Sequence, residues 1–325
     1  MFFIQHTNET LSFQEMASPE INSQEVLIEV RAAGINRADL LQRAGKYPPP
    51  QGASHILGLE VSGIIKAKGE AVANWQVGDK VMALLSGGGY AQQAKAHQNL
   101  LMPLPEGFSF EQGAALPEAF LTAYQALFLV GKACPQERVL IHAGASGVGT
   151  AAIQLAKVFD LEVVTTCSTA KMATCRNLGA DLVIDYTNEN FYQKIQTFYP
   201  SSKEAGIDLI IDCIGASYWT DNLKSLRLDG RLVLLAALSG VKIDNFNIAT
   251  LLTKRLQILG TTLRNRSLSY QSDLIFQFWK NTKNLWAEGK LMPIIDSVFE
   301  WQQAEEAHKR MQANLNMGKI VLKVS

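Results

Sequence analysis

A glycine-rich segment near the middle of the chain has the residue types and spacing needed to bind a phosphate group. Gly144-Ala145-Ser146-Gly147-Val148-Gly149 follows the apolar run 139–143 and opens a stretch, 148–159, whose apolar residues recur at helical spacing. Glycines in such a loop allow a tight turn close to a pyrophosphate, while the helix N-terminus offers free N–H groups. The segment predicts a dinucleotide-binding loop; a tight turn without a ligand is the alternative. The predicted cofactor contacts are Gly144, Ser146, Gly147, Val148 and Gly149.

The segment after the next apolar run bears on the choice of dinucleotide. A domain that binds NAD usually places Asp or Glu about 20 residues beyond the glycines, where the carboxylate binds the ribose hydroxyls. Here residues 166–171 contain no carboxylate that would repel a 2′-phosphate. Ser168 can donate a hydrogen bond and Lys171 can neutralise charge, so we predict NADPH. We expect Tyr186 to pack against the adenosine phosphate end. The alternatives are a solvated helix lysine at Lys171 and simple surface packing of Tyr186.

Regular alternation of apolar runs and helical stretches surrounds this loop. The strand-like runs are 139–143, 162–166, 182–185, 207–212, 232–235 and 257–260, and the helical stretches between them include 148–159, 170–178 and 189–198. Alternating apolar strands and helices are typical of a parallel sheet covered on both faces. The pattern predicts an α/β, doubly wound domain of Rossmann type over residues 120–262.

The two ends of the chain lack this alternation. The first third is predicted to be β-rich, with strands at 25–30, 61–65 and 80–85, and with loops at 45–50, which holds three prolines, and at 86–90. From about residue 264 a long helical stretch runs to Gly289, and 318–322 is a closing strand. A lone strand needs a sheet, so we expect it to rejoin the first domain. That domain is therefore predicted to comprise residues 1–119 and 263–325.

Composition sets the broad class of the protein. The chain has 325 residues, enough for about two domains, with 47% hydrophobic and 18% charged residues. Its formal net charge is zero, which gives no overall attraction to nucleic acid or to a membrane surface. No window approaches the ~20 apolar residues of a membrane-spanning helix, and the short apolar start lacks the features of a signal peptide. We therefore predict a cytoplasmic protein whose partner is a small molecule.

The cysteines and histidines do not form a recognisable metal site. Cys134, Cys167, Cys175 and Cys213 contain no C-x-x-C pair, so we expect free thiols packed mostly as small apolar residues. No pair among the five histidines has the helical spacing of metal ligands; these are His6, His55, His97, His142 and His308. The sequence therefore predicts no metal ion.

Seven stretches spread over nearly the whole chain carry a family resemblance; they are 36–43, 56–60, 82–85, 116–123, 141–144, 212–215 and 306–309. With them the chain resembles the medium-chain dehydrogenase/reductase superfamily and, within it, the zinc-free quinone oxidoreductases. The likeness is greatest to the tumour-suppressor-inducible quinone oxidoreductases, with zeta-crystallin a more distant relative. The resemblance implies a GroES-like, β-rich catalytic domain beside the Rossmann domain, and a homodimer.

One departure from the superfamily concerns zinc. Its zinc alcohol dehydrogenases carry Gly-His-Glu where this chain has Gly58-Leu59-Glu60, and leucine cannot bind a metal. The four-cysteine lobe that holds a structural zinc is also missing. The resemblance thus agrees with a metal-free enzyme and leaves Glu60 with a structural role.

The resemblance also implies roles for particular residues. Asn36 and Tyr47 are expected to line the cleft near the nicotinamide and to hydrogen-bond a quinone oxygen or an ordered water. Thr122 is expected to contact the nicotinamide or its ribose, and Leu263, with Arg264, to border the nicotinamide. The alternatives are a turn-stabilising amide at Asn36, a loop aromatic that shapes the pocket at Tyr47, and simple packing at Thr122.

These expectations combine into a metal-free reaction. A quinone is already electrophilic and its reduced anion is resonance-stabilised, so the protein has mainly to position the reactants and supply a few hydrogen-bond donors. We therefore predict NADPH-dependent reduction of quinones. The alternatives are an NADPH-dependent enoyl or enone reductase and a non-enzymatic, crystallin-like binding protein. The final Rossmann strand, near 257–262, could pair across the two-fold axis of a dimer and protect its edge.

Overall fold

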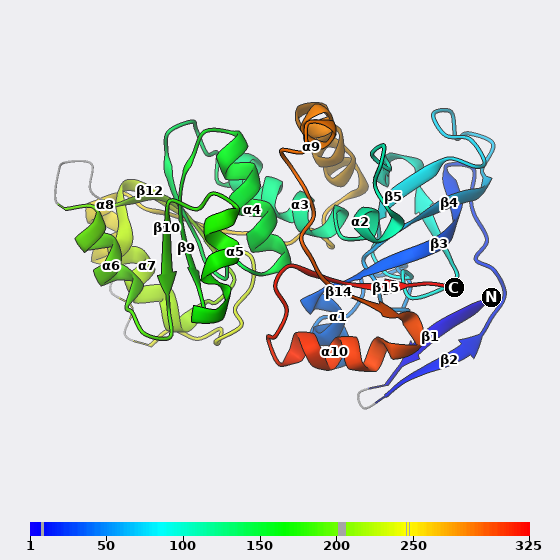
Figure 1. Ribbon diagram of the computed structural model, residues 1–325, viewed down its shortest axis with the longest axis horizontal. Helices are drawn as coiled ribbons and strands as arrows, with labels where there is room; N and C mark the ends of the chain where they lie inside the picture. The colour runs from blue at the N-terminus through cyan, green and yellow to red at the C-terminus, as the bar shows by residue number, and fades with distance from the viewer. Residues whose placement is uncertain (8–9, 201–205, 245, 247) are drawn as a thin grey trace. The chain divides into compact units, whose positions relative to one another are not determined.

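The computed structural model describes residues 1–7, 10–200, 206–244, 246 and 248–325 (Figure 1). The chain forms two compact units. The first comprises Met1–Leu121 together with Leu263–Ser325, and the second comprises Thr122–Thr262. These limits differ by two residues from the domain limits predicted at 119 and 120.

The first unit is built on a mixed sheet with the strand order β14-β15-β3-β4-β5-β7, and β6 also pairs with β3. A separate hairpin joins β1 and β2. The strands are β1 (Phe2–His6), β2 (Leu11–Glu15), β3 (Glu25–Ile35), β4 (Glu60–Lys68), β5 (Lys80–Leu84), β6 (Gln93–His97), β7 (Leu101–Pro103), β14 (Ile295–Glu300) and β15 (Lys319–Lys323). The helices are α1 (Arg37–Arg43), η1 (Gln98–Leu100), α2 (Phe110–Ala114), α9 (Leu268–Ala287), η5 (Trp301–Gln303) and α10 (Ala304–Gln312).

Strand β3 organises the core of this unit. Val26, Ile28 and Val30 alternate inward along it, the two-residue period of a strand with one buried face. The closing strand β15 lies antiparallel to β3, with Ile320 opposite Ile35. The prediction that the C-terminal strand rejoins the first domain is therefore confirmed. This pairing also brings the start of β15 beside the end of β3, where α1 begins.

The second unit holds a parallel sheet in the order β10-β9-β8-β11-β12-β13. The strands are β8 (Arg138–Ile141), β9 (Glu162–Cys167), β10 (Leu182–Asp185), β11 (Ile207–Asp212), β12 (Leu226–Leu234) and β13 (Gln257–Gly260). Counted in chain order, this is the 3-2-1-4-5-6 arrangement of a Rossmann domain. The helices are α4 (Gly147–Val158), η3 (Thr169–Lys171), α5 (Met172–Asn177), α6 (Phe191–Phe198), η4 (Ala216–Tyr218), α7 (Trp219–Ser225) and α8 (Ala249–Lys254). They cover both faces of the sheet (Figure 1). The α/β prediction is confirmed.

Two helices differ from their predicted form. Apolar residues recur at helical spacing over 118–130 and predict one helix there, whereas the structure has α3 (Pro117–Tyr124) followed by a π-helical turn, η2 (Gln125–Val130). Gln125 in this turn is fully buried, and its amide donates to the hydroxyl of Thr261 at 2.9 Å. The stretch predicted over 170–178 begins with the separate 3-10 turn η3. Apolar periodicity marks a helical region but does not register such local changes of winding.

Within the described residues, none of the helices is long and apolar enough to cross a membrane. The same residues hold no group of three or more His, Cys, Asp or Glu side chains placed to bind a metal ion.

Candidate functional site

The glycine-rich loop follows β8 and is shaped by close packing. The N–H of Gly144 donates to Thr166 O at 2.9 Å, which ties the loop to the neighbouring strand β9. A Cβ on Gly144 would collide with the hydroxyl of Thr165, and a Cβ on Gly149 would collide with Ala143 O. Both positions therefore require glycine to keep the loop folded against the strand ends.

The N-terminus of α4 opens directly from this loop. Ser146 is the N-cap, and its hydroxyl accepts a hydrogen bond from the N–H of Gly149 at 3.0 Å. The N–H groups of Gly147 and Val148, in the first turn, have no intrahelical acceptor and stay available to an anion. The loop follows the carboxyl end of β8, at the point where the strand order reverses between β8 and β11. Open α/β sheets bind ligands at this switch point, so the loop fits the pyrophosphate of a dinucleotide.

The residues predicted to select the 2′-phosphate lie together at the carboxyl ends of β9 and β10. The N–H of Tyr186 donates to Cys167 O at 3.2 Å, and the N–H of Lys171 donates to Ser168 O at 2.9 Å. Tyr186 is 50% exposed.

A carboxylate that the sequence analysis missed lies beside these residues. Asp185 ends β10, and its carboxylate accepts hydrogen bonds from the hydroxyls of Thr169 and Thr187 and from the amide of Asn188. The hydrogen bonds from Thr169 and Thr187 hold the pKa of Asp185 well below its usual range. The charge is thus held by local donors rather than left open to a ribose hydroxyl.

A buried polar network links the strand ends beneath the glycine loop. His142 contacts the hydroxyl of Thr166 through Nδ1 at 3.0 Å and Oδ1 of Asn222 through Nε2 at 2.7 Å. The amide of Asn222 then donates to Asp212 at 3.1 Å. Burial lowers the pKa of His142 to about 4, so its ring is neutral at pH 7. Burial also raises the pKa of Asp212 to about 6, although the N–H groups of Ile214 and Gly215 oppose the shift.

In the first unit the buried polar groups centre on Lys319. Its ammonium group donates to Ile35 O at 2.9 Å, to Oδ1 of Asn36 at 2.6 Å and to Oε1 of Glu60 at 2.5 Å. The amide of Asn36 also donates to Oε1 of Glu60 at 2.8 Å. Glu60 is fully buried and Lys319 is 3% exposed. Both ends of the Asn36 amide are therefore fixed by a buried ion pair.

Two further carboxyl groups lie near this ion pair. The backbone N–H of Glu118, in the first turn of α3, donates to Oε2 of Glu60 at 2.8 Å. Burial, and then the charge of Glu60, raises the pKa of the Glu118 carboxyl to about 8. Asp39 accepts from the N–H groups of Asn36 and Gly58, and its burial raises its pKa to about 6.

Tyr47 lies on the loop after α1 and is held by Arg264. The guanidinium carbon is 5.4 Å from the centre of the Tyr47 ring, and the guanidinium also donates to Ser86 O and to the side chain of Gln42. Burial and the nearby Glu118 carboxyl raise the pKa of Tyr47 above its ordinary value of 10. The phenol therefore stays protonated near neutral pH and can donate a hydrogen bond.

The structure thus brings Asn36 and Tyr47 into one polar neighbourhood of the first unit. Leu263 is buried there, and its carbonyl accepts from Gln271 at 3.0 Å. Thr122 is half-buried in α3.

Sequence reasoning missed the roles of Lys319, Glu118 and Asp39, and it expected Arg264 only to border the nicotinamide. The one signal in the sequence for this role is that Lys319 is a charged residue at the start of the otherwise apolar run 319–322.

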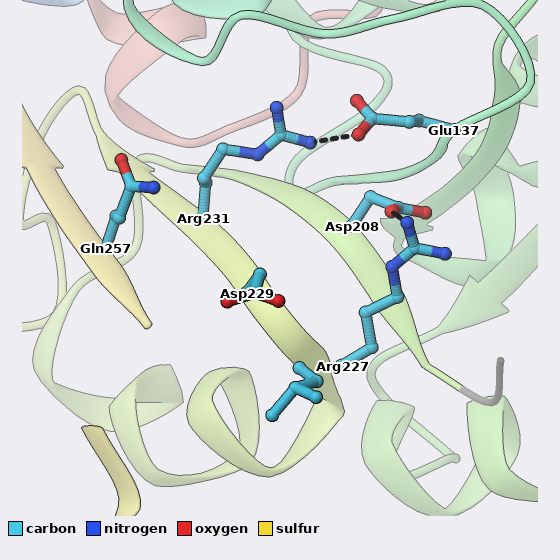
Figure 2. A pocket seen from close by; sticks show the side chains of 7 residues that line it. Glu137, Asp208, Arg227, Asp229, Arg231 and Gln257 are labelled. Carbon is cyan, nitrogen blue, oxygen red and sulfur yellow. Dashed lines mark hydrogen bonds and ion pairs between the residues drawn. The ribbon is translucent and has the colours of Figure 1, made fainter. Parts of the chain in front are cut away.

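A cavity of about 410 Å³ lies at a different place in the second unit. Figure 2 shows the side chains that line it. It lies at the amino-terminal ends of the parallel strands, the edge opposite to the glycine loop. Its charged residues are paired: Glu137 with Arg231, Asp208 with Arg227, and Asp229 with Arg255. These pairs tie strand starts together and leave no charge to recognise a ligand.

Comparison with known proteins places these features in a family. Residues 22–106 match the family model of the alcohol dehydrogenase GroES-like domain, and residues 147–277 match that of the zinc-binding dehydrogenases. Quinone oxidoreductase of Rattus norvegicus is 31% identical over 319 residues, which cover 97% of this chain and 94% of the relative. The synaptic vesicle membrane protein VAT-1 homolog of Danio rerio is 34% identical over 318 residues, which cover 94% of this chain. The match spans only 65% of that relative's length.

Solved structures give the same picture. The CurK enoyl reductase superposes with a TM-score of 0.87 at 29% identity, covering 100% of this chain and 99% of that one. A quinone oxidoreductase of Pseudomonas syringae pv. Tomato superposes with a TM-score of 0.86 at 27% identity, with 99% of each chain covered. A mycobacterial protein complexed with NADPH does so with a TM-score of 0.86 at 26% identity, again with 99% of each chain covered.

Proposed function

Because the chain belongs to the quinone oxidoreductase-like proteins of the medium-chain dehydrogenase/reductase superfamily, we propose that it reduces quinones with NADPH and without a metal ion. As a member of this superfamily it is an oxidoreductase that uses a nicotinamide cofactor. We assign the unit Thr122–Thr262 to dinucleotide binding and the other unit to a GroES-like catalytic domain.

The glycine loop at the switch point of the parallel sheet carries the cofactor assignment. In this proposal the N–H groups of Gly147 and Val148, with Ser146, hold the pyrophosphate, while Gly144 and Gly149 keep the backbone close. Ser168, Lys171 and Tyr186 take the 2′-phosphate and adenosine end, and Thr122 and Leu263 contact the nicotinamide end. The bound nicotinamide supplies the hydride. A protein in the comparison that is complexed with NADPH supports this cofactor.

Asn36 and Tyr47 are proposed to bind the oxygen of the acceptor. The Asn36 amide uses one N–H for Glu60 and keeps a second for the acceptor. The Lys319–Glu60 pair fixes the direction of that amide. Arg264 holds the ring of Tyr47, and the Tyr47 hydroxyl offers a further hydrogen-bond donor. Donors fixed before the reaction stabilise the negative charge that develops on the oxygen as hydride arrives.

The metal-free character of the reaction remains a prediction and rests on the chemistry of the side chains. Leu59 is 1% exposed and apolar, at the position where zinc alcohol dehydrogenases carry histidine. A quinone carbonyl accepts hydride without a Lewis acid, because the product anion is delocalised.

An enoyl or enone reductase is the second candidate. The CurK enoyl reductase, at 29% identity, favours it, and such a reaction uses the same cofactor site. The donors on Asn36 and Tyr47 would then bind the carbonyl oxygen of the enone rather than that of a quinone.

Oxidation of NADPH and NADH with an ortho-quinone, a para-quinone and a short enone, each with and without chelator, tests the proposal. We expect quinone turnover that is insensitive to chelator and faster with NADPH. Turnover of the enone alone would replace the quinone with the second candidate. Tight binding of NADPH without oxidation by any acceptor would favour the non-enzymatic, crystallin-like role.

We also propose that the protein is a homodimer that pairs through β13, the last strand of the parallel sheet. Among the residues that the structure describes, only β12 pairs with this strand, so its other edge offers free backbone groups. Sedimentation at micromolar concentration should give the mass of a dimer, and a monomer mass would contradict the pairing. A cytoplasmic location stays a prediction.

A further inference from the structure

Asp185, the last residue of β10, is a buried carboxylate beside the proposed dinucleotide site. It lies opposite Cys167, the last residue of β9, in the parallel pairing of these two strands (Figure 1). Its side chain is buried, although the residues that follow it are exposed. Directly after β9 the chain forms the turn η3, with Ser168 as its N-cap. Asp185 is therefore level with the start of the segment that is proposed to bind the 2′-phosphate.

The acceptor sites of the Asp185 carboxylate are filled by the protein itself. Oδ1 accepts from the backbone N–H of Thr187 at 3.0 Å and from the hydroxyl of the same residue at 2.6 Å. Oδ2 accepts from the hydroxyl of Thr169 and from the amide of Asn188 at 2.8 Å. A carboxylate has about four acceptor sites, two on each oxygen. This carboxylate is thus committed to its neighbours and is not placed to bind ribose hydroxyls, as a strand-end Asp does in NAD-specific domains.

One of these donors comes from the neighbouring strand's turn. The others belong to the loop directly after β10, so their hydrogen bonds shape only that loop. Thr169, in contrast, is the first residue of η3 and lies 16 positions before Asp185 in the chain. Its hydrogen bond ties the turn after β9 to the end of β10. The N–H of Tyr186, which donates to Cys167 O at 3.2 Å, is a second tie between the same two strand ends.

The turn η3 bears both groups that are proposed to bind the phosphate. Ser168 is its N-cap, but its side chain makes no capping hydrogen bond. The backbone N–H of Lys171 donates to Ser168 O at 2.9 Å, so the two residues stand at opposite ends of one closed turn. A helical turn of three residues is too short to hold its form without contacts from outside. A shift of this turn would therefore displace both phosphate-binding groups together.

We propose that Asp185 is a positioning residue for NADPH. Through Thr169 it holds the turn η3 in the form in which Ser168 and Lys171 take the 2′-phosphate. Its role is indirect, because its acceptor sites are occupied by protein donors. This inference rests on the proposed function, from which it takes the dinucleotide site and the phosphate contacts. The hydroxyls of Thr169 and Thr187 hold the pKa of Asp185 well below its usual range, so the bonds persist throughout the neutral pH range.

Equilibrium binding of NADPH and NADH, followed by fluorescence titration, tests the proposal. In Asp185→Asn one acceptor oxygen becomes an amide that donates, so the four hydrogen bonds cannot all be kept. Thr169→Val removes only the hydroxyl at nearly constant volume, and Thr169→Ser keeps it. The control is Asp181→Asn, just before β10. Asp181 carries the same charge and also joins the two strands, at their other ends, by accepting from the N–H of Val163 at 2.7 Å.

We expect the Kd of NADPH to rise about 10-fold in Asp185→Asn and about 5-fold in Thr169→Val, with the Kd of NADH unchanged. Thr169→Ser and Asp181→Asn should bind both dinucleotides as the wild type does. If Asp185→Asn and Thr169→Val weaken both dinucleotides by the same factor, or neither, Asp185 does not position the phosphate site and the proposal is wrong. Tighter binding of NADPH by Asp185→Asn would mean that its charge repels the phosphate, which also overturns the proposal.

Two smaller ligands separate this inference from the proposed function. Adenosine 2′,5′-bisphosphate differs from adenosine 5′-monophosphate only in the 2′-phosphate. The wild type should prefer the bisphosphate, and Thr169→Val should lose most of that preference. A wild type without the preference contradicts the NADPH assignment of the proposed function. A preference that Thr169→Val and Asp185→Asn retain in full contradicts the role of Asp185 alone.

Discussion

The two units bury polar groups in different ways. In the first unit the interior holds an ion pair, Lys319–Glu60, at its centre. In the second unit the corresponding buried chain runs from Thr166 through His142 and Asn222 to Asp212, a buried carboxyl group that accepts from the Asn222 amide and from backbone N–H groups. Both sets lie where strands end, and both have their hydrogen bonds largely satisfied. The difference is that the first unit binds its buried carboxylate with a cation, whereas the second binds its carboxyl group with uncharged donors.

This difference matches what each unit is proposed to do. A network of uncharged donors around one carboxyl group is enough to hold backbone loops in place, because the loop itself presents N–H groups to the cofactor. A charged cluster costs more to bury, but it can hold a proton on one member and orient a neighbouring amide. We infer that the second unit is built for rigidity of the backbone and the first for control of charge.

The largest effect should come from breaking the buried ion pair. Lys319→Met leaves Glu60 as an uncompensated buried charge, and we expect the free energy of unfolding to fall by about 3–5 kcal/mol. Chemical denaturation measures it. The control is Lys323→Met on the same strand, whose pair with Glu300 is exposed and should cost less than about 1 kcal/mol.

A double variant, Lys319→Met with Glu60→Leu, distinguishes two contributions to the free energy of unfolding. One is the cost of leaving the Glu60 charge unpaired, and the other is the net contribution of the ion pair. We expect it to recover much of the lost stability while its kcat stays low, because Asn36 is no longer oriented. If the double variant is less stable than Lys319→Met alone, the charged interior of the first unit contributes to stability after all.

The next effect concerns the backbone of the second unit. Gly149→Ala places a Cβ against Ala143 O, so the loop must shift away from its cofactor-binding form. We expect the Kd of NADPH to rise by about 100-fold or more, roughly 2.7 kcal/mol. Fluorescence titration measures it. Gly260→Ala, which adds its Cβ in open space, is the control and should bind as the wild type does.

Acid should weaken the network of the second unit through His142. Above pH 6.5 the imidazole of His142 is neutral in both the folded and unfolded states. Between pH 6.5 and about 4 the unfolded chain takes up a proton that the folded chain does not. The free energy of unfolding therefore decreases as the pH falls through this range. The loss attributable to this group is on the order of 2–3 kcal/mol.

The variant His142→Leu removes this titration. It should be less stable than the wild type at pH 7, because Thr166 and Asn222 lose their partner, and its stability should fall less between pH 7 and pH 4. Unfolding curves at several pH values measure both quantities. An equal acid dependence in the variant and the wild type would mean that His142 is not the group concerned.

The smallest effect lies at the surface of the second unit. Lys171→Ala removes one charge from the proposed 2′-phosphate site, and we expect the Kd of NADPH to rise about 10-fold, or ~1.4 kcal/mol. The Kd of NADH should not change, since it lacks that phosphate. Lys157→Ala, on α4 and paired with Asp181, serves as the control. Equal losses for both dinucleotides would remove Lys171 from phosphate recognition.

Local patterns were sufficient to predict the second unit. The runs 182–185 and 207–212 coincide with β10 and β11, because strands buried on both faces are short, apolar and bounded by polar turns. The run 257–260 coincides with β13, which is more exposed. The glycine loop could also be predicted from the sequence, because its spacing reflects a local backbone requirement. The sequence did not reveal Asp185 beside Thr169, because that contact joins two neighbouring strands.

Taken alone, the sequence determined the α/β class, the glycine loop and the closing strand, all of which follow from short-range periodicity. Only the tertiary structure decided which polar residues meet. Glu60 and Lys319 are 259 residues apart in the chain, and His142 and Asn222 are 80 apart. The register of β15 against β3, with Ile320 opposite Ile35, is what sets Lys319 beside Asn36. A buried charge is tolerable only where its partner is fixed at bonding distance, and that distance is a property of strand pairing rather than of either segment by itself.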